Sequence, residues 1–226
     1  MTEPFLYFFI PGLPLHVVYT WILMIVLVGV ALLVRGSLQL VPAGGQNFFE
    51  AFFGGMLNFI DDVMGHRGRA YFPLLATLGL YIFGANLMAL IPGFMSPTAN
   101  INTTASCAVT VFLMTHFVGV RTHGLSYLKQ FTGPIWWLAP LMIVIELIGH
   151  LARPLSLSVR LFGNIFGKDQ VIVSFFVLGI LFKWLYLPML APSLILVFAI
   201  FMGFIQAFVF VLLSMIYLAG ALEEHH

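Results

Sequence analysis

Long apolar runs are the feature that most limits the folds open to this chain. Three runs, at 16–34, 72–92 and 104–120, have the length of one helix across a bilayer, which needs about 20 apolar residues. Two further runs, at 135–187 and 189–222, exceed an upright span and predict tilted or kinked helices. Because backbone groups in lipid must be hydrogen-bonded internally, such runs form helices. The sequence therefore predicts an all-α integral membrane protein with about five spans.

Composition agrees with a membrane protein and removes several function classes. Of the 226 residues, 62% are hydrophobic and 8% are charged, against roughly 25% charged in a soluble domain. The net charge of +1 offers no cationic surface for a nucleic acid. Cys107 is the single cysteine, so no internal disulfide is expected, and no Cys/His cluster has zinc spacing. We expect no nucleic acid partner, no metal and no cofactor.

The stretch 44–66, between the first two runs, mixes aromatic and apolar residues with acidic ones. This mixture predicts an amphipathic helix at the membrane interface, although an ordinary connecting helix fits the same pattern. Residues 1–15 form an N-terminal segment without the basic region and small-residue cleavage site of a removable signal peptide. We therefore expect one membrane domain over 1–226.

Basic residues in the loops predict the orientation. If the first three spans alternate, one side collects Arg35, Arg67, Arg69, Arg121 and Lys129. Cytoplasmic loops are enriched in Lys and Arg, so the N-terminus is expected outside. Two more spans then bring the C-terminal residues 223–226 to the cytoplasm, with Lys183 as an exception on the outer side.

Polar side chains of the region 146–164 share one helical face. Rotating 100° per residue from Glu146 places the polar members within about 40° of it; they are His150, Arg153, Arg160 and Asn164. Pro154 should bend the helix without dispersing this stripe. The opposite face is expected to meet lipid or other protein, and its members include Leu151, Leu155, Leu161 and Phe162.

Arg160 is the member of this stripe that most needs an explanation. A charged side chain at bilayer depth costs at least about 2.5 to 3.5 kcal/mol on insertion scales. Asp169 is nine positions further on and points elsewhere on the wheel, so another chain or a wet cavity should compensate the charge. Gln206, in the last run, is expected to hydrogen-bond to Arg160 or Asn164. Alternatively, Glu146, His150 and Arg153 pair with one another and only hold helices together.

Four segments give the chain its resemblance to subunit a of the F-type ATP synthase, the membrane stator beside a rotating ring of subunit c. They are 86–93 (NLMALIPG), 97–104 (PTANINTT), 153–164 (RPLSLSVRLFGN) and 206–210 (QAFVF), followed by Tyr217 and Leu218. The resemblance covers roughly residues 15 to 224. It implies that the last two helices form a long, strongly tilted hairpin along the ring.

The resemblance also implies a function and its residues. Protons would reach and leave the ring through two half-channels, with Arg160 between them preventing a short circuit and promoting deprotonation of the ring carboxylate. Glu146 matches the cytoplasmic half-channel, and Asn164, Asp169 and Gln206 match the opposite one or its approach to Arg160, with His150 as an added member. The implied partners are the ring of subunit c, the subunit b peripheral stalk, the rest of the synthase and the lipid bilayer. The implied location is the bacterial inner membrane.

Some positions depart from the family pattern, and two other function classes stay open. Asn100, Ala199 and Lys168 stand where many members differ, which makes the outer half-channel the least defined part.

No nucleotide-binding loop occurs, so ATP chemistry is expected on partner subunits. A secondary ion-coupled transporter could use Gly163 and Gly167 as helix breaks. A haem or metal enzyme could use His116, His123 and His150, which lack paired helical spacing. The choice between proton and sodium lies outside this sequence.

Overall fold

The chain folds as a bundle of α-helices. The structure, a computed structural model, describes residues 12–36, 38–39, 44–91, 93–124, 127, 138–181 and 187–222. The described α-helices are α1 (Leu15–Gly36), α2 (Gly45–Met64), α3 (Phe72–Met88), α4 (Ile101–His123), α6 (Ala139–Leu181) and α7 (Leu187–Leu222). Two short 3-10 helices, η1 (His66–Tyr71) and η2 (Pro97–Ala99), complete the described elements. The predicted all-α fold is confirmed; Lys129, Lys183 and residues 223–226 lie outside the described part.

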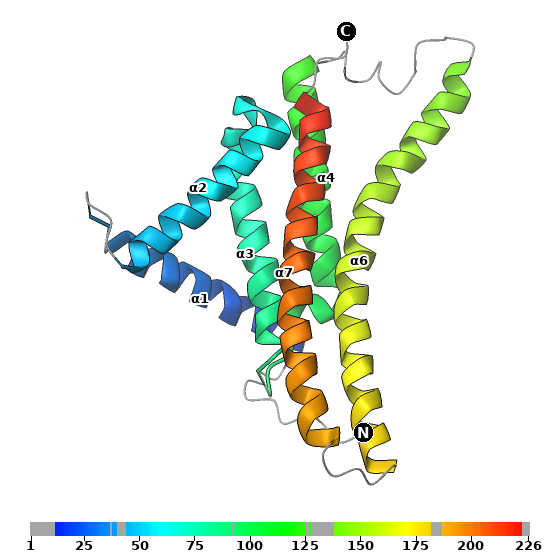
Figure 1. The fold of residues 1–226 in the computed structure, drawn as a ribbon. Coiled ribbons are helices and arrows are strands. Elements are labelled where there is room, and N and C mark those ends of the chain that lie inside the picture. Colours follow the sequence, from blue (N-terminus) through cyan, green and yellow to red (C-terminus); the bar gives the residue numbers. More distant parts are fainter. Residues whose placement is uncertain are drawn as a thin grey trace.

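Within the described residues, five helical stretches are long and apolar enough to cross a membrane, as predicted. They are Leu15–Gly36, His66–Met88, Ile101–His123, Pro140–Gly167 and Leu196–Leu222. The two C-terminal helices are the longest, with 43 residues in α6 and 36 in α7. At 1.5 Å per residue they measure about 65 and 54 Å, whereas the hydrocarbon layer is about 30 Å thick. Neither helix fits upright inside that layer, and the two run side by side in opposite directions as a hairpin (Figure 1).

Helix α2 is the amphipathic element outside these five spans. Its apolar side chains Ile60 and Met64 are buried, whereas Phe48 and Phe52 are exposed. At its end, Asp61 accepts a hydrogen bond of 2.8 Å from Nε of Arg69 in η1. This hydrogen bond and the positive charges of Arg69 and His66 hold the pKa of Asp61 below its ordinary value. The predicted interfacial helix therefore has one apolar face on the protein and an acidic end held by an ion pair.

The core lies between α3, α4, α6 and α7, with the N-terminal half of α1 packed on one side. Helix α3 lies along α7, and α4 contacts both α6 and α7. Figure 1 shows α1 and α2 slanting away from this bundle to one side. Small residues lie at the buried contacts, among them Ala85, Ala108 and Ala207. Small side chains let helix backbones approach closely, which is the main source of helix association in lipid.

The face of α6 that enters this core differs from the expected one at Leu161. The prediction that Leu161 faces outward is wrong, because the side chain is fully buried in the core. Leu161 lies fifteen positions after Glu146, which is only about 60° away on the helical wheel. Leu151 and Leu155, on the far side of the wheel, are exposed as expected.

Asn100, one of the positions that depart from the family pattern, has a local structural role. Its side chain accepts a hydrogen bond of 2.9 Å from the backbone N–H of Asn102 and so caps the first turn of α4. Asparagine is among the preferred residues at this position because its oxygen satisfies a backbone donor that has no partner inside the helix. Asn100 therefore begins the helix that carries His116.

Candidate functional site

The polar stripe of α6 lies along the edge of its buried face. His150 is buried, and Glu146, Arg153 and Asn164 are partly buried. Arg160 is exposed on the outer flank of the stripe. No described carboxylate lies within ion-pair distance of the Arg160 guanidinium. Asp169 lies in α6, but its side chain is outside the described part of the chain.

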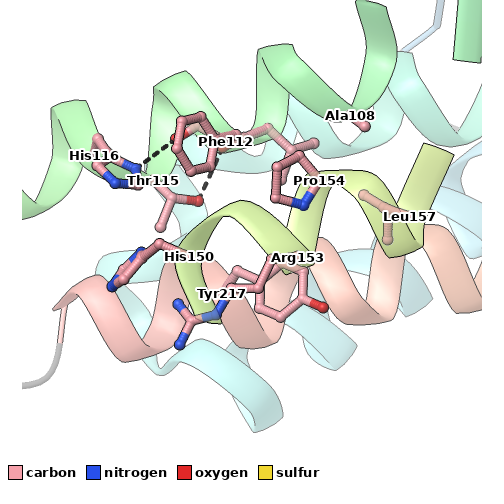
Figure 2. A pocket seen from close by; sticks show the side chains of 10 residues that line it. Ala108, Phe112, Thr115, His116, His150, Arg153, Pro154, Leu157 and Tyr217 are labelled. Carbon is pink, nitrogen blue, oxygen red and sulfur yellow. Dashed lines mark hydrogen bonds between the residues drawn. The ribbon is translucent and has the colours of Figure 1, made fainter. Parts of the chain in front are cut away.

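Near the start of α6, five residues from three helices form what we call the imidazole cluster: His116, Glu146, His150, Arg153 and Tyr217. Nε2 of His150 lies 3.1 Å from Oε1 of Glu146. The rings of His116 and His150 have their centroids 5.1 Å apart and are tilted by 72°. The Arg153 guanidinium carbon lies 5.4 Å from the centre of the Tyr217 ring. Figure 2 shows the two imidazoles side by side between α4 and α6. Glu146 and His150 thus form the pair expected from their spacing.

Further along α6, a second set of polar residues forms what we call the amide–hydroxyl network: Asn86, Ser96, Thr98, Asn164 and Gln206. Nδ2 of Asn164 donates to Oε1 of Gln206 at 3.5 Å, so the predicted contact between these two amides is present. Nδ2 of Asn86 donates to the carbonyl of Gly203 at 3.0 Å, one turn before Gln206. The Thr98 hydroxyl lies 3.5 Å from Oδ1 of Asn86 and 2.8 Å from the Ser96 hydroxyl. The network therefore reaches from the α3–α4 connection to the hairpin.

Close helix contact allows this network to form. The α-carbon of Gly203 is so near Asn86 that an added Cβ would lie 3.0 Å from the Asn86 Cβ. Any larger residue at 203 would push α3 away from α7 and lengthen the hydrogen bond to Asn86. Gly203 is therefore required for the contact between Asn86 and the helix that carries Gln206.

The two sets of polar residues are separated by apolar core. Between them lie the fully buried side chains of Leu161 and Phe210, together with Leu157 and Ala207. Along α6, Glu146 and Arg160 are fourteen residues apart, or about 21 Å, whereas Asn164 follows Arg160 by one turn, or about 6 Å. The imidazole cluster and the amide–hydroxyl network are therefore separate along α6, and Arg160 lies between them on the exposed flank.

Sequence reasoning did not single out three members of the amide–hydroxyl network. Asn86 was available as a signal, because it is a lone amide inside the run 72–92. Ser96 and Thr98 look like ordinary loop residues, and only the fold shows that both are buried. A similar hydroxyl pair, Thr104 and Ser158, lies 3.3 Å apart between α4 and α6.

The histidines do not form a metal centre within the described residues. No group of three or more His, Cys, Asp or Glu side chains there is arranged to hold a metal ion. His123 is away from the other two, with Nε2 3.2 Å from the carbonyl of Ala221. His116 and His150 are neighbours, and Glu146 is their nearest carboxylate in the described part. The arrangement has the chemistry of a proton-exchanging group, since imidazole and carboxylate both take up and release protons.

Comparison with known proteins identifies the family. The model of the family described as ATP synthase A chain matches residues 17–219. ATP synthase subunit a of Geobacter sulfurreducens is 51% identical over 94% of this chain and 93% of that protein. ATP synthase subunit a 1 of Syntrophotalea carbinolica is 54% identical over 95% and 88%, and subunit a 3 of Pelobacter propionicus is 48% identical over the full length of both. This chain therefore belongs to the ATP synthase subunit a family.

Proposed function

We propose that this chain is the proton-translocating stator subunit of a bacterial ATP synthase, forming two half-channels against a ring of subunit c. The observation that carries the proposal is the position of Arg160. It is exposed on the side of the hairpin, and the two polar regions lie on either side of it along α6. A single through-channel would need a continuous polar path, whereas buried Leu157 and Leu161 interrupt it here.

Arg160 acts as the barrier between the half-channels and as the group that discharges the ring. A guanidinium stays protonated at any physiological pH. At 4 Å and an effective dielectric constant of about 20, it stabilises an ionised carboxylate on a passing ring subunit by about 4 kcal/mol. That exceeds the roughly 2.3 kcal/mol that one charge gains in crossing 100 mV. Arg160 therefore favours release of the ring proton and repels a proton that would cross directly.

The two polar regions supply the two half-channels. Glu146 and His150 belong to the cytoplasmic half-channel, where a carboxylate and an imidazole can exchange protons with water. Asn164 and Gln206 belong to the outer half-channel, where amides hold water in place, and Asp169 supplies its acidic group. The chain acts as one membrane domain over 1–226, with its N-terminus outside and its C-terminus in the cytoplasm.

The proposal includes the partners that the family resemblance implies. The exposed flank around Arg160 faces the ring of subunit c, since an intramembrane charge needs compensation from another chain. The subunit b peripheral stalk holds the chain stationary, and nucleotide chemistry belongs to other subunits of the synthase. We assign no nucleic acid partner to this chain.

The test is Arg160→Ala in the whole synthase reconstituted into liposomes, with ATP-driven acidification as the readout. We expect no acidification, although the complex assembles and stays in the membrane. Arg35→Ala is the matched control, because it removes an exposed arginine in the last turn of α1 that belongs to neither polar region. Acidification at the wild-type rate by Arg160→Ala overturns the proposal. Ion transport by the chain without a ring would instead support the secondary-transporter alternative.

A further inference from the structure

We propose that His116 and His150 form a paired imidazole site that holds one proton next to Glu146, which makes His116 a further proton-transfer residue of this subunit. The inference rests on the proposed function, because Glu146 must lie on the proton path. His116 comes from α4, whereas Glu146 and His150, the residues assigned to the cytoplasmic half-channel, lie on α6. The site therefore joins two helices.

Hydrogen bonds fix which nitrogen of each ring can exchange a proton. Nδ1 of His116 lies 2.9 Å from the carbonyl of Phe112, and a carbonyl only accepts hydrogen bonds, so Nδ1 carries the hydrogen. Nε2 is then the basic nitrogen of His116. Nε2 of His150 donates to the Glu146 carboxylate when that group is ionised, so Nδ1 is the basic nitrogen of this tautomer. Each neutral ring thus has one nitrogen able to take up a proton.

The distance between the rings suits transfer between them and prevents double occupancy. With centroids 5.1 Å apart, the rings are near enough for one bridging water to carry a proton between their nitrogens. Two imidazolium charges at this distance repel each other. Within the described residues, the charged groups around the pair are Glu146 and Arg153 on α6, and the titratable phenols are Tyr127 after α4 and Tyr217 on α7. Because two imidazolium charges would repel each other while Glu146 supplies one negative charge, the pair takes one proton at a time.

The surroundings exclude a wide water channel at this point. The cavity beside the two histidines is about 10 Å³ and is lined mainly by apolar residues, with Pro154 and Tyr217 among them. That volume holds at most one water molecule. A proton that crosses between α4 and α6 here therefore has the two imidazoles and at most one water molecule to carry it, and Figure 2 shows His116 on α4 facing His150 on α6.

Packing holds His116 in this position. Its ring lies 4.2 Å from Phe112 and 6.0 Å from Tyr127, centroid to centroid. Tyr127 reaches this place because residue 119 is a glycine: an added Cβ there would lie 2.4 Å from the Tyr127 ring. His116 could thus be an ordinary packing residue, and the experiment has to separate ring shape from ring nitrogen.

The test uses His116→Phe, which keeps an aromatic ring and removes both nitrogens. In liposomes containing the whole synthase, we expect proton flux near neutral pH to fall about tenfold. This is less than the 10²-fold or more of a group used in the reaction step, because Glu146 remains. The loss should shrink as the cytoplasmic side is acidified, since protons then reach Glu146 without the pair.

Two further variants serve as comparisons. His116→Gln, which keeps a donor for the Phe112 carbonyl, should give the same pH profile as His116→Phe. His123→Phe is the matched control on α4 and should leave the profile unchanged.

A second readout does not depend on flux. Nitrogen-15 NMR of histidine-labelled complex should show His116 and His150 titrating as a coupled pair, and His150→Phe should remove that coupling. Wild-type flux at every pH in His116→Phe, or independent titration of the two rings, overturns the inference. If Arg160→Ala still pumps, the proposed function itself fails; if Arg160→Ala is inactive and His116→Phe is normal, only the histidine pair fails.

Discussion

The imidazole cluster and the amide–hydroxyl network flank the same arginine but differ in chemistry. The cluster contains a carboxylate, two imidazoles and a guanidinium, whereas the described side chains of the network are amides and hydroxyls. Groups of the first kind change their charge when they take up a proton. Amides and hydroxyls keep theirs and act by orienting hydrogen bonds. Under the proposed function, the described groups on one side of Arg160 can therefore store a proton, and those on the other side can guide one.

Among the variants that compare the two polar regions, those at Glu146 should lose the most proton flux. Glu146→Leu removes the carboxylate that accepts the hydrogen bond of His150, and it leaves the imidazoles without an acid on the proton path. We expect proton flux through the reconstituted synthase to fall about 10²-fold, the lower figure for a positioned acid–base group, with ATP hydrolysis and transport still coupled. The matched variant Glu146→Asp should recover part of the flux. Unchanged flux in Glu146→Leu would remove the cluster from the path.

Disrupting the network should have a smaller effect and a different pH dependence. Asn86→Leu deletes the donor to the Gly203 carbonyl, and an unsatisfied buried group costs about 1–3 kcal/mol. We expect a lower midpoint of thermal unfolding and a moderate loss of flux that is the same at every pH, because no titrating group is removed. Scanning fluorimetry and flux measurements at several pH values test both parts.

Gln206→Leu provides the comparison within the network. It removes the acceptor of Asn164 and keeps the contact between Asn86 and Gly203, so flux should fall with less loss of stability than in Asn86→Leu. A pH-dependent loss in either variant would contradict the division between a storing side and a guiding side.

The sequence predicted which residues share a face of α6 better than it predicted which side chains are buried and which helices they contact. A period of 3.6 residues placed Glu146, His150 and Asn164 on one face, and the contact of Asn164 with Gln206 followed from their positions in a hairpin. Leu161 was assigned to the opposite face although the wheel places it about 60° from Glu146, and the side chain is buried in the core. Contacts between distant segments, such as Asn86 with Gly203 or His116 with His150, depend on how helices pack. A single helical period contains no information on that packing.

The smallest expected effect is on thermal stability and comes from Asp61 and Arg69. This ion pair lies outside the bundle core, so it shows how much an exposed pair contributes in comparison with the buried groups. The hydrogen bond from Arg69 lowers the pKa of Asp61 in the folded chain below the roughly 3.9 of an unfolded one. A lowered carboxyl pKa contributes stability that is complete above the unfolded value and is lost as the pH falls through the folded value. Wild-type and Arg69→Gln should therefore differ slightly in thermal midpoint at pH 7, and the difference should vanish once the pH has fallen below the folded pKa of Asp61. Added salt should reduce it, because screening weakens exposed pairs. A difference that persists in acid would mean that Arg69 stabilises the α2–η1 connection by packing rather than by charge. The pair could then not be compared with the charged groups of the imidazole cluster.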